Sequence, residues 1–277
     1  MRTAIVFDSA GTLLKVYRVA KDVARKQLVE NVVSTNIIVK GHNCALVALK
    51  AEPVEIFGID KDIYVSEFID KNNILMDIVC RGTKCPGEQI REAAIEDRSA
   101  TIGDLQEAIA AVKFKCKDIY YVNIGLVVDI ANRSIPYVLA TGGKLFTGVT
   151  GMIGRIMASG ADVYIASGDN YKSLITLAEE LKIPLSNVYD ALSPSGKRDV
   201  VMSLKEKYDR VIMVGDGIND QLAFQAADMG VLTLQQDGTR PVILYESADL
   251  IVDNILEVEN IVEESLHMIK EQNRKNQ

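Results

Sequence analysis

Residues 210–220, "RVIMVGDGIND", join a short apolar run to a turn rich in glycine, asparagine and aspartate. The run is apolar from Val211 to Val214, which is typical of a strand buried on both faces of a parallel sheet. Similar runs stand at 162–166, 187–192, 230–234 and 248–254, and amphipathic helical patterns occupy 147–160, 171–182, 196–208 and 220–228. This alternation predicts βαβ units, in which helices cover both faces of a parallel sheet.

The N-terminal apolar run, residues 4–7, stands far from this alternating region. We expect it to join the same sheet, which gives an α/β, Rossmann-like core at 1–15 and 141–277 and an α+β cap domain inserted at 16–140. Within the insert, periodicity predicts strands at 35–41, 44–50, 74–80, 119–130 and 135–140, and helices at 17–31, 60–70, 87–96 and 101–114. The charged residues of 17–30 are expected on a solvated helix face. Residues 255–275 predict a closing amphipathic helix.

The composition is that of an ordinary globular protein. The 277 residues are 48% hydrophobic and 25% charged, and a formal charge of −7 with a pI near 5.1 disfavours nucleic acid as a partner. No apolar run approaches the roughly 20 residues of a membrane span, and the N-terminus lacks the layout of a signal peptide. We therefore expect a cytoplasmic protein without a membrane partner; its oligomeric state stays open.

Polar residues follow the predicted core strands at the points where they end. Ligands of parallel sheets bind beyond the carboxyl ends of the strands, so these residues should converge. In chain order they are Asp8, Gly11 and Thr12; Ser167, Gly168, Asp169 and Asn170; Lys197; and Asp216, Asn219 and Asp220. The collection predicts a phosphoryl-binding site at one edge of the sheet.

The chemistry of phosphoryl transfer explains these residue types. A carboxylate attacks phosphorus when a divalent cation relieves the repulsion between two anions, and Mg²⁺ is satisfied by a few carboxylate and carbonyl oxygens. Ser167 and Lys197 can hold the remaining phosphoryl oxygens. Glycines 11, 168, 215 and 217 would let the backbone approach closely and turn sharply. Asp169 and Asn170 fit a helix N-cap as well as a ligand contact.

Four segments in order, "FDSAGTL", "IASGDN", "SPSGK" and "VGDGIND", resemble the motifs of the haloacid-dehalogenase superfamily. Within it the similarity is greatest to the phosphorylation domain of P-type ATPases. The resemblance spans residues 1–14 and about 145–265 and leaves the insert uncovered. It implies a hydrolase of phosphatase or ATPase type that acts on a small phosphorylated substrate, with ATP as one candidate.

The resemblance also implies a role for each motif residue. Asp8 would be the nucleophile, which becomes an aspartyl phosphate, and would bind Mg²⁺ together with the Ala10 carbonyl and Asp216. Asp220 would lie near the metal's water ligands and Lys197. The phosphoryl group would contact the side chains of Ser167, Lys197 and Asn219. Thr12 would hydrogen-bond within the first-motif loop, beside Gly11, and Gly168 and Asp169 would shape the phosphate loop.

Ala10 departs from the phosphatases of this superfamily, which have an aspartate there as general acid and base. Loss of such a group typically costs on the order of 10²- to 10⁴-fold in rate. Three hypotheses follow: a slow enzyme of the P-type ATPase kind, a low-activity or non-catalytic module that binds a phosphorylated ligand, and a C–P bond hydrolase like phosphonoacetaldehyde hydrolase, whose first motif "DSAGT" matches. The last would need a lysine of the insert that periodicity does not single out.

The four cysteines are too few for a disulfide scaffold in a chain of this length, so reduced thiols are expected. All four fall in the insert, together with one histidine: Cys44, Cys80, Cys85, Cys116 and His42. Their spacing is not that of tight metal-binding pairs. Buried or free thiols are favoured over a metal site.

Overall fold

The computed structural model describes residues 2–30, 42–116, 119–169 and 171–275. The chain forms two compact units, Met1–Val16 with Lys144–Gln277, and Tyr17–Gly143. We call the first the core unit and the second the cap unit.

The core unit contains a six-stranded sheet in the order β12-β11-β10-β1-β8-β9, in which every neighbouring pair is parallel. The strands are β1 (Thr3–Phe7), β8 (Asp162–Ala166), β9 (Val188–Tyr189), β10 (Arg210–Gly215), β11 (Met229–Thr233) and β12 (Leu250–Val252). All five residues of β1 are buried, as expected of a central strand with helices on both faces. The predicted α/β class with a parallel sheet is confirmed.

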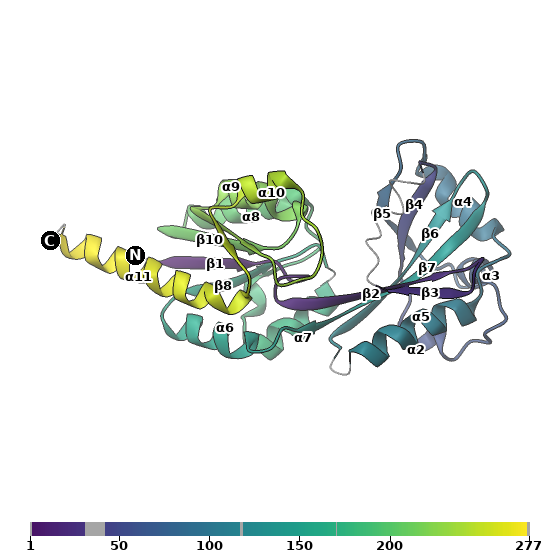
Figure 1. Cartoon of the computed structure of the whole chain (residues 1–277), viewed down its shortest axis with the longest axis horizontal. Helices are drawn as coiled ribbons and strands as arrows, with labels where there is room; N and C mark the ends of the chain where they lie inside the picture. The colour runs from purple at the N-terminus through teal and green to yellow at the C-terminus, as the bar shows by residue number, and fades with distance from the viewer. Residues whose placement is uncertain (1, 31–41, 117–118, 170, 276–277) are drawn as a thin grey trace. The chain divides into compact units, whose positions relative to one another are not determined.

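Helices cover both faces of this sheet. They are α6 (Val149–Ala158), α7 (Tyr171–Leu181), α8 (Pro194–Lys205), α9 (Gln221–Ala226), α10 (Val242–Ser247) and α11 (Val258–Lys275), with short 3₁₀ helices η1 (Leu185–Asn187), η2 (Ile218–Asp220) and η3 (Ile255–Glu257). Figure 1 shows α8, α9 and α10 on one face and α6 and α11 on the other. Val201 of α8, Phe224 of α9 and Leu244 of α10 share one buried cluster with Val6 of β1. Helix α10 is not among the predicted helices, because residues 242–245 are apolar in succession and show no helical period.

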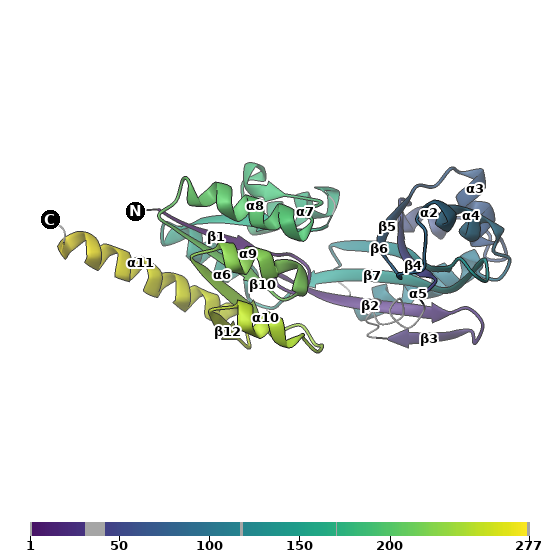
Figure 2. The same cartoon turned by 90° about the horizontal axis from the view of Figure 1, so that it is seen from above.

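The cap unit contains a second six-stranded sheet, in the order β3-β2-β7-β6-β4-β5. Its strands are β2 (Leu14–Asp22), β3 (Gln27–Glu30), β4 (Cys44–Leu49), β5 (Met76–Arg81), β6 (Tyr121–Asp129) and β7 (Ser134–Leu145). Its helices are α2 (Pro53–Ile56), α3 (Val65–Lys71), α4 (Glu88–Glu96) and α5 (Ile102–Lys115). The chain passes between the units within β2 and β7, which Figure 2 shows from above. The insert is therefore α+β, and the strand predicted at 35–41 lies outside the described residues.

The helix predicted at 17–31 is wrong. Residues 17–30, the described part of this segment, belong to an antiparallel hairpin of β2 and β3, in which Val19 pairs with Glu30 and Asp22 with Gln27. The apolar spacing at 16, 19, 20 and 23 matches a helix, but pairing with neighbouring strands overrides that local preference. Asp22 Oδ1 accepts a 2.9 Å hydrogen bond from the Arg25 backbone and Lys26 has a positive φ of 54°, so the chain turns here. The prediction that the charged residues of 17–30 lie on a solvated helix face is wrong too, since Lys21 and Asp22 are buried.

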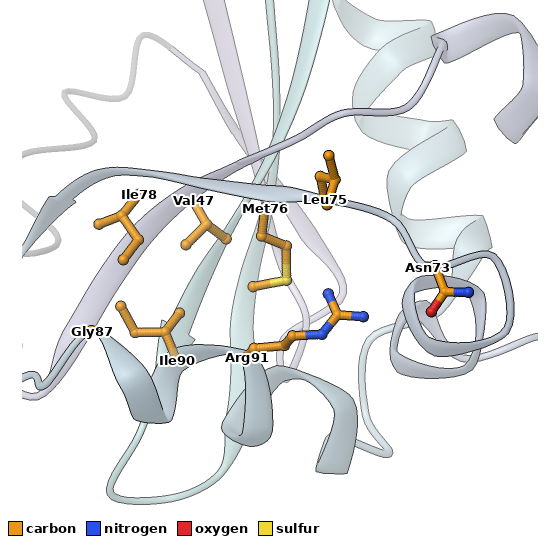
Figure 3. Close-up of a pocket in the computed structure, with 8 residues that line it drawn as sticks. All are labelled: Val47, Asn73, Leu75, Met76, Ile78, Gly87, Ile90 and Arg91. Carbon is orange, nitrogen blue, oxygen red and sulfur yellow. The ribbon is translucent and has the colours of Figure 1, made fainter.

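The cap unit has a hollow of about 310 Å³ between β5 and α4. Figure 3 shows the Met76 side chain pointing from the strand toward the helix that carries Ile90 and Arg91. The lining consists of Val47, Asn73, Leu75, Met76, Ile78, Gly87, Ile90 and Arg91. One guanidinium nitrogen of Arg91 donates to the Ile74 carbonyl at 2.9 Å. This lining holds no carboxylate, hydroxyl, thiol or imidazole side chain, so it offers no catalytic nucleophile.

Candidate active site

Asp8 is the first residue after the central strand β1. Its backbone N–H donates to the Val214 carbonyl at 2.9 Å, which ties the strand end to β10. β10 and β8 flank β1 on either side, and the Asp8 side chain is buried at the carboxyl edge between them. The backbone of Asp8 is therefore fixed by the hydrogen bonds of the central strands, and its carboxylate has a fixed point of attachment.

Lys197 reaches this carboxylate from α8. The helix begins at Pro194, and the Ser193 hydroxyl caps it by accepting the Gly196 N–H at 3.1 Å. The Lys197 side chain is 1% exposed, and its Nζ donates to Asp8 Oδ1 and Asp220 Oδ1, both at 2.6 Å. Burial alone lowers the pKa of Lys197, but the charges of Asp8 and Asp220 outweigh it and raise that pKa above its ordinary value. Lys197 therefore stays a cation.

Three carboxylates meet at this edge. Ligand atoms of Asp8, Asp216 and Asp220 lie within 4.8 Å of one another, the one such group among the described residues. Burial, followed by the charges of Asp220 and Asp216, holds the pKa of Asp8 well above its usual range despite Lys197. Burial and the charge of Asp220 likewise raise the pKa of Asp216 to about 7, although Arg240 and Lys197 oppose this. The close packing of these carboxylates therefore disfavours their simultaneous ionisation, even with Lys197 and Arg240 beside them.

The donor set fits a divalent cation that prefers oxygen. Both oxygens of Asp220 are taken, Oδ1 by Lys197 and Oδ2 by the N–H groups of Asp216 at 3.2 Å and Gly217 at 3.1 Å. Asp8 and Asp216 each keep one oxygen that no described residue bonds, and the Ala10 carbonyl likewise accepts no hydrogen bond from the described backbone. Two carboxylate oxygens and a carbonyl are ligands that Mg²⁺ accepts while it keeps several waters.

The loop after Asp8 depends on Gly11. Its φ of +86° is unfavourable for other residues, and a Cβ there would lie 2.3 Å from Asp216 Oδ2. Gly11 thus lets the first-motif loop lie against the Asp216 carboxylate. Within this loop Thr12 donates its backbone N–H to the Ser9 carbonyl at 3.3 Å, while its buried hydroxyl has no partner among the described residues.

Ser167 directly follows β8 and forms a hydrogen-bonded cluster with the Ser9 hydroxyl and the Asp169 carboxylate. Its Oγ is 2.8 Å from Ser9 Oγ and donates to Asp169 Oδ2 at 3.1 Å, and the Ser9 hydroxyl also donates to Asp169 Oδ2. The Asp169 N–H donates back to Ser167 Oγ at 3.1 Å. Ser9 is absent from the predicted site, because in the sequence it looks like a spacer between Asp8 and Ala10.

Other predicted site residues lie apart from these contacts. Asn219 is exposed in η2 and makes no described hydrogen bond to Asp8, Ser167 or Lys197. At Gly168 and Gly217 a Cβ would meet nothing closer than 3.4 Å, whereas at Gly215 it would lie 2.5 Å from the Asp220 carboxyl. Asn170 falls outside the described residues.

The cysteines do not form a metal-binding group in the part of the chain that is described. All four are thiols that form no disulfide: Cys44, Cys85 and Cys116 are buried, and Cys80 is half-buried. Burial, with the nearby charges of Asp129 and Cys85, raises the pKa of Cys44 to about 11. His42 is exposed.

Arg240 is a site residue that sequence reasoning missed. It lies in the loop after β11, and its Nη2 donates to Asp216 Oδ2 at 3.1 Å. The signal was present, since "QQDGTRP" also follows the carboxyl end of a core strand. Because this segment matches none of the four motifs, the sequence alone does not single out Arg240.

Comparisons with known proteins place the chain in a family of hydrolases. Residues 3–228 match the family model of haloacid dehalogenase-like hydrolases, and the chain belongs to that family. It is similar to the soluble P-type ATPase-like phosphatase of Methanocaldococcus jannaschii, 33% identical over 265 residues, which is 94% of this chain and 93% of that one.

Two further matches are partial or distant. A copper-transporting ATPase of Saccharomyces cerevisiae is 35% identical over 99 residues, which is 35% of this chain but only 10% of that protein. A solved catalytic domain of the CPx-ATPase CopB-B matches with a TM-score of 0.47 and 15% identity, covering 94% of this chain and 88% of that one. Among the described helices of our chain, none combines the length and apolar character that crossing a bilayer requires.

Proposed function

We propose that the protein is a Mg²⁺-dependent phosphohydrolase that acts on a small phosphorylated substrate through an aspartyl phosphate at Asp8. The observation that carries this is the pairing of the buried Asp8 carboxylate with Lys197, beside Asp216 and Asp220 at the carboxyl edge of the sheet. The relative of 33% identity, described as a phosphatase, supports the same reaction class. ATP is a candidate substrate, because the partial relatives are ATPases.

In the first half-reaction an oxygen of Asp8 forms a bond to phosphorus, and the bond from phosphorus to the leaving oxygen breaks. Lys197 holds Asp8 Oδ1 in place at 2.6 Å, which orients the carboxylate and offsets its charge. Mg²⁺ bound by Asp8 and Asp216 would neutralise charge between the carboxylate and the phosphoryl group. The hydroxyl of Ser167, released from Asp169, would donate to a phosphoryl oxygen.

In the second half-reaction water attacks phosphorus, which releases inorganic phosphate and restores the Asp8 carboxylate. Ala10 has no group to protonate the leaving oxygen or to take a proton from that water, so both protons are exchanged with solvent. Absence of a positioned acid and base makes both steps slow, by about 10²- to 10⁴-fold. With an activated donor such as acetyl phosphate, whose leaving group needs no general acid, only the second step is slowed, so we expect the phosphorylated form to accumulate.

A covalent label tests this proposal. Incubation with ³²P-labelled acetyl phosphate or γ-³²P-ATP and Mg²⁺, followed by an acid quench, should leave label that is stable in acid, released by hydroxylamine and confined to the peptide containing Asp8. The Asp8→Ala protein is the matched control and should take up none. Label on another residue, or turnover by the wild-type protein without any label, would contradict the mechanism.

Ala10→Asp should accelerate hydrolysis by on the order of 10²-fold or more, because it supplies the acid and base that the native loop lacks. The rate of 4-nitrophenyl phosphate hydrolysis and the decay of the ³²P label both measure it. Ala10→Asn is the control of equal size without an ionisable group. Equal rates for the two variants would contradict a rate limited by the missing acid and base, and would favour a module that binds a phosphorylated ligand.

A further inference from the structure

Arg240 makes hydrogen bonds that join its loop to the proposed metal site. Its side chain is 7% exposed. The Nε donates to the Asp216 carbonyl and Nη2 to Asp216 Oδ2, both at 3.1 Å, so one guanidinium spans the backbone and the side chain of the same residue. This two-point contact restricts rotation of the Asp216 carboxylate.

The Arg240 guanidinium is also held by backbone carbonyls of its own loop. Its Nη1 donates to the Gln236 carbonyl at 2.6 Å and to the Gly238 carbonyl at 2.9 Å. The Gln236 side chain in turn accepts the Val16 N–H at 2.8 Å and donates to the Val16 carbonyl at 3.3 Å. Arg240 is therefore held by the loop whether or not Asp216 binds another group.

The same oxygen of Asp216, Oδ2, lies against Gly11, where even a Cβ would come within 2.3 Å of it. The first-motif loop and Arg240 therefore both approach Asp216 at Oδ2. Since Arg240 takes Oδ2, the oxygen left without a described partner is Oδ1.

We propose that Arg240 is a positioning residue, which holds Asp216 in one orientation so that a single carboxylate oxygen is presented to the divalent cation. The inference rests on the proposed function, because it assumes that Asp216 is a metal ligand. Hydrogen-bond partners of metal ligands commonly contribute 10- to 100-fold to metal affinity, because they fix the ligand before the ion arrives. The gain in Mg²⁺ affinity from a fixed Asp216 carboxylate outweighs the loss from repulsion between Arg240 and the cation.

Arg240→Lys and Arg240→Gln together test this inference by calorimetric titration of the full chain with Mg²⁺ alone. Lysine keeps the charge, but its compact ammonium cannot span the two Asp216 oxygens and the loop carbonyls. We expect the Mg²⁺ dissociation constant to rise by about 10- to 100-fold in both variants. The half-saturating Mg²⁺ for hydrolysis should rise in parallel, while kcat at saturating Mg²⁺ changes little.

An unchanged Mg²⁺ affinity in Arg240→Lys would overturn the positioning role. Tighter Mg²⁺ binding in Arg240→Gln would also overturn it, because it would show that Arg240 repels the cation more than it positions Asp216. Arg198→Lys is the matched control, since Arg198 is exposed on α8 and pairs with Asp199. Asp216→Asn separates the two proposals. If it binds Mg²⁺ like the wild-type protein, the proposed metal site fails; if it loses binding while both Arg240 variants keep it, only the role of Arg240 fails.

Discussion

Asp8→Asn should abolish turnover of 4-nitrophenyl phosphate in Mg²⁺, with a fall on the order of 10⁴-fold or more. An amide oxygen cannot form the acyl phosphate, and no described neighbour can replace it, because Asp220 is held by Lys197 and by two backbone N–H groups. Steady-state rates of variant and wild-type protein purified in parallel measure the loss.

The same variant should keep its fold. Burial and two neighbouring carboxylates raise the pKa of Asp8, so the ionised form costs stability in the folded protein above the ordinary pKa of an aspartate. A neutral amide removes that cost, and Lys197 still pairs with Asp220. We expect an unchanged or higher Tm at pH 7.

The asparagine of this variant would precede Ser9 and could deamidate back to aspartate, so Asp8→Ala is the second control. Full activity in Asp8→Ala would rule out the nucleophile assignment. Loss of activity with a collapsed Tm in both variants would contradict the charge balance inferred for the cluster.

Lys197→Met should lower the free energy of unfolding by about 3–5 kcal/mol, the range seen when one partner of a buried ion pair is removed. Lys197 is the cation between Asp8 and Asp220, and those side chains are 5% and 0% exposed. Without it, the buried carboxylates of Asp8 and Asp220 lose the cation that they share. Urea denaturation without divalent cations measures the effect, and hydrolysis should be lost as well.

The matched control is Lys205→Met, at the other end of the same helix. Lys205 pairs with Asp228, and both side chains are about one third exposed, so its loss should cost less than about 1 kcal/mol. Adding Asp8→Asn to Lys197→Met should recover part of the stability, because it removes one uncompensated charge. A Lys197→Met protein as stable as Lys205→Met would contradict this account of the site.

Much of the core could be predicted from local pattern. Buried parallel strands are apolar at successive positions, so β1, β8, β10 and β11 stand out in the sequence, and the polar residues that follow them converge at one edge. The helix expected at 17–31 fails for the opposite reason. Its apolar spacing satisfies a helix, and only pairing within the cap sheet makes it a hairpin.

The sequence by itself determined the family, the parallel core with its inserted α+β segment, and the motif residues from Asp8 to Asp220, because these depend on periodicity and on order along the chain. Only the tertiary structure decided which atoms meet. It placed Lys197 between two carboxylates, joined Ser9 to Ser167, and brought Arg240 onto Asp216 from a loop that carries no motif. Arg240 and Asp216 are 24 positions apart in the sequence, and Lys197 and Asp8 are 189 positions apart. Local sequence preference does not encode contacts at such separations.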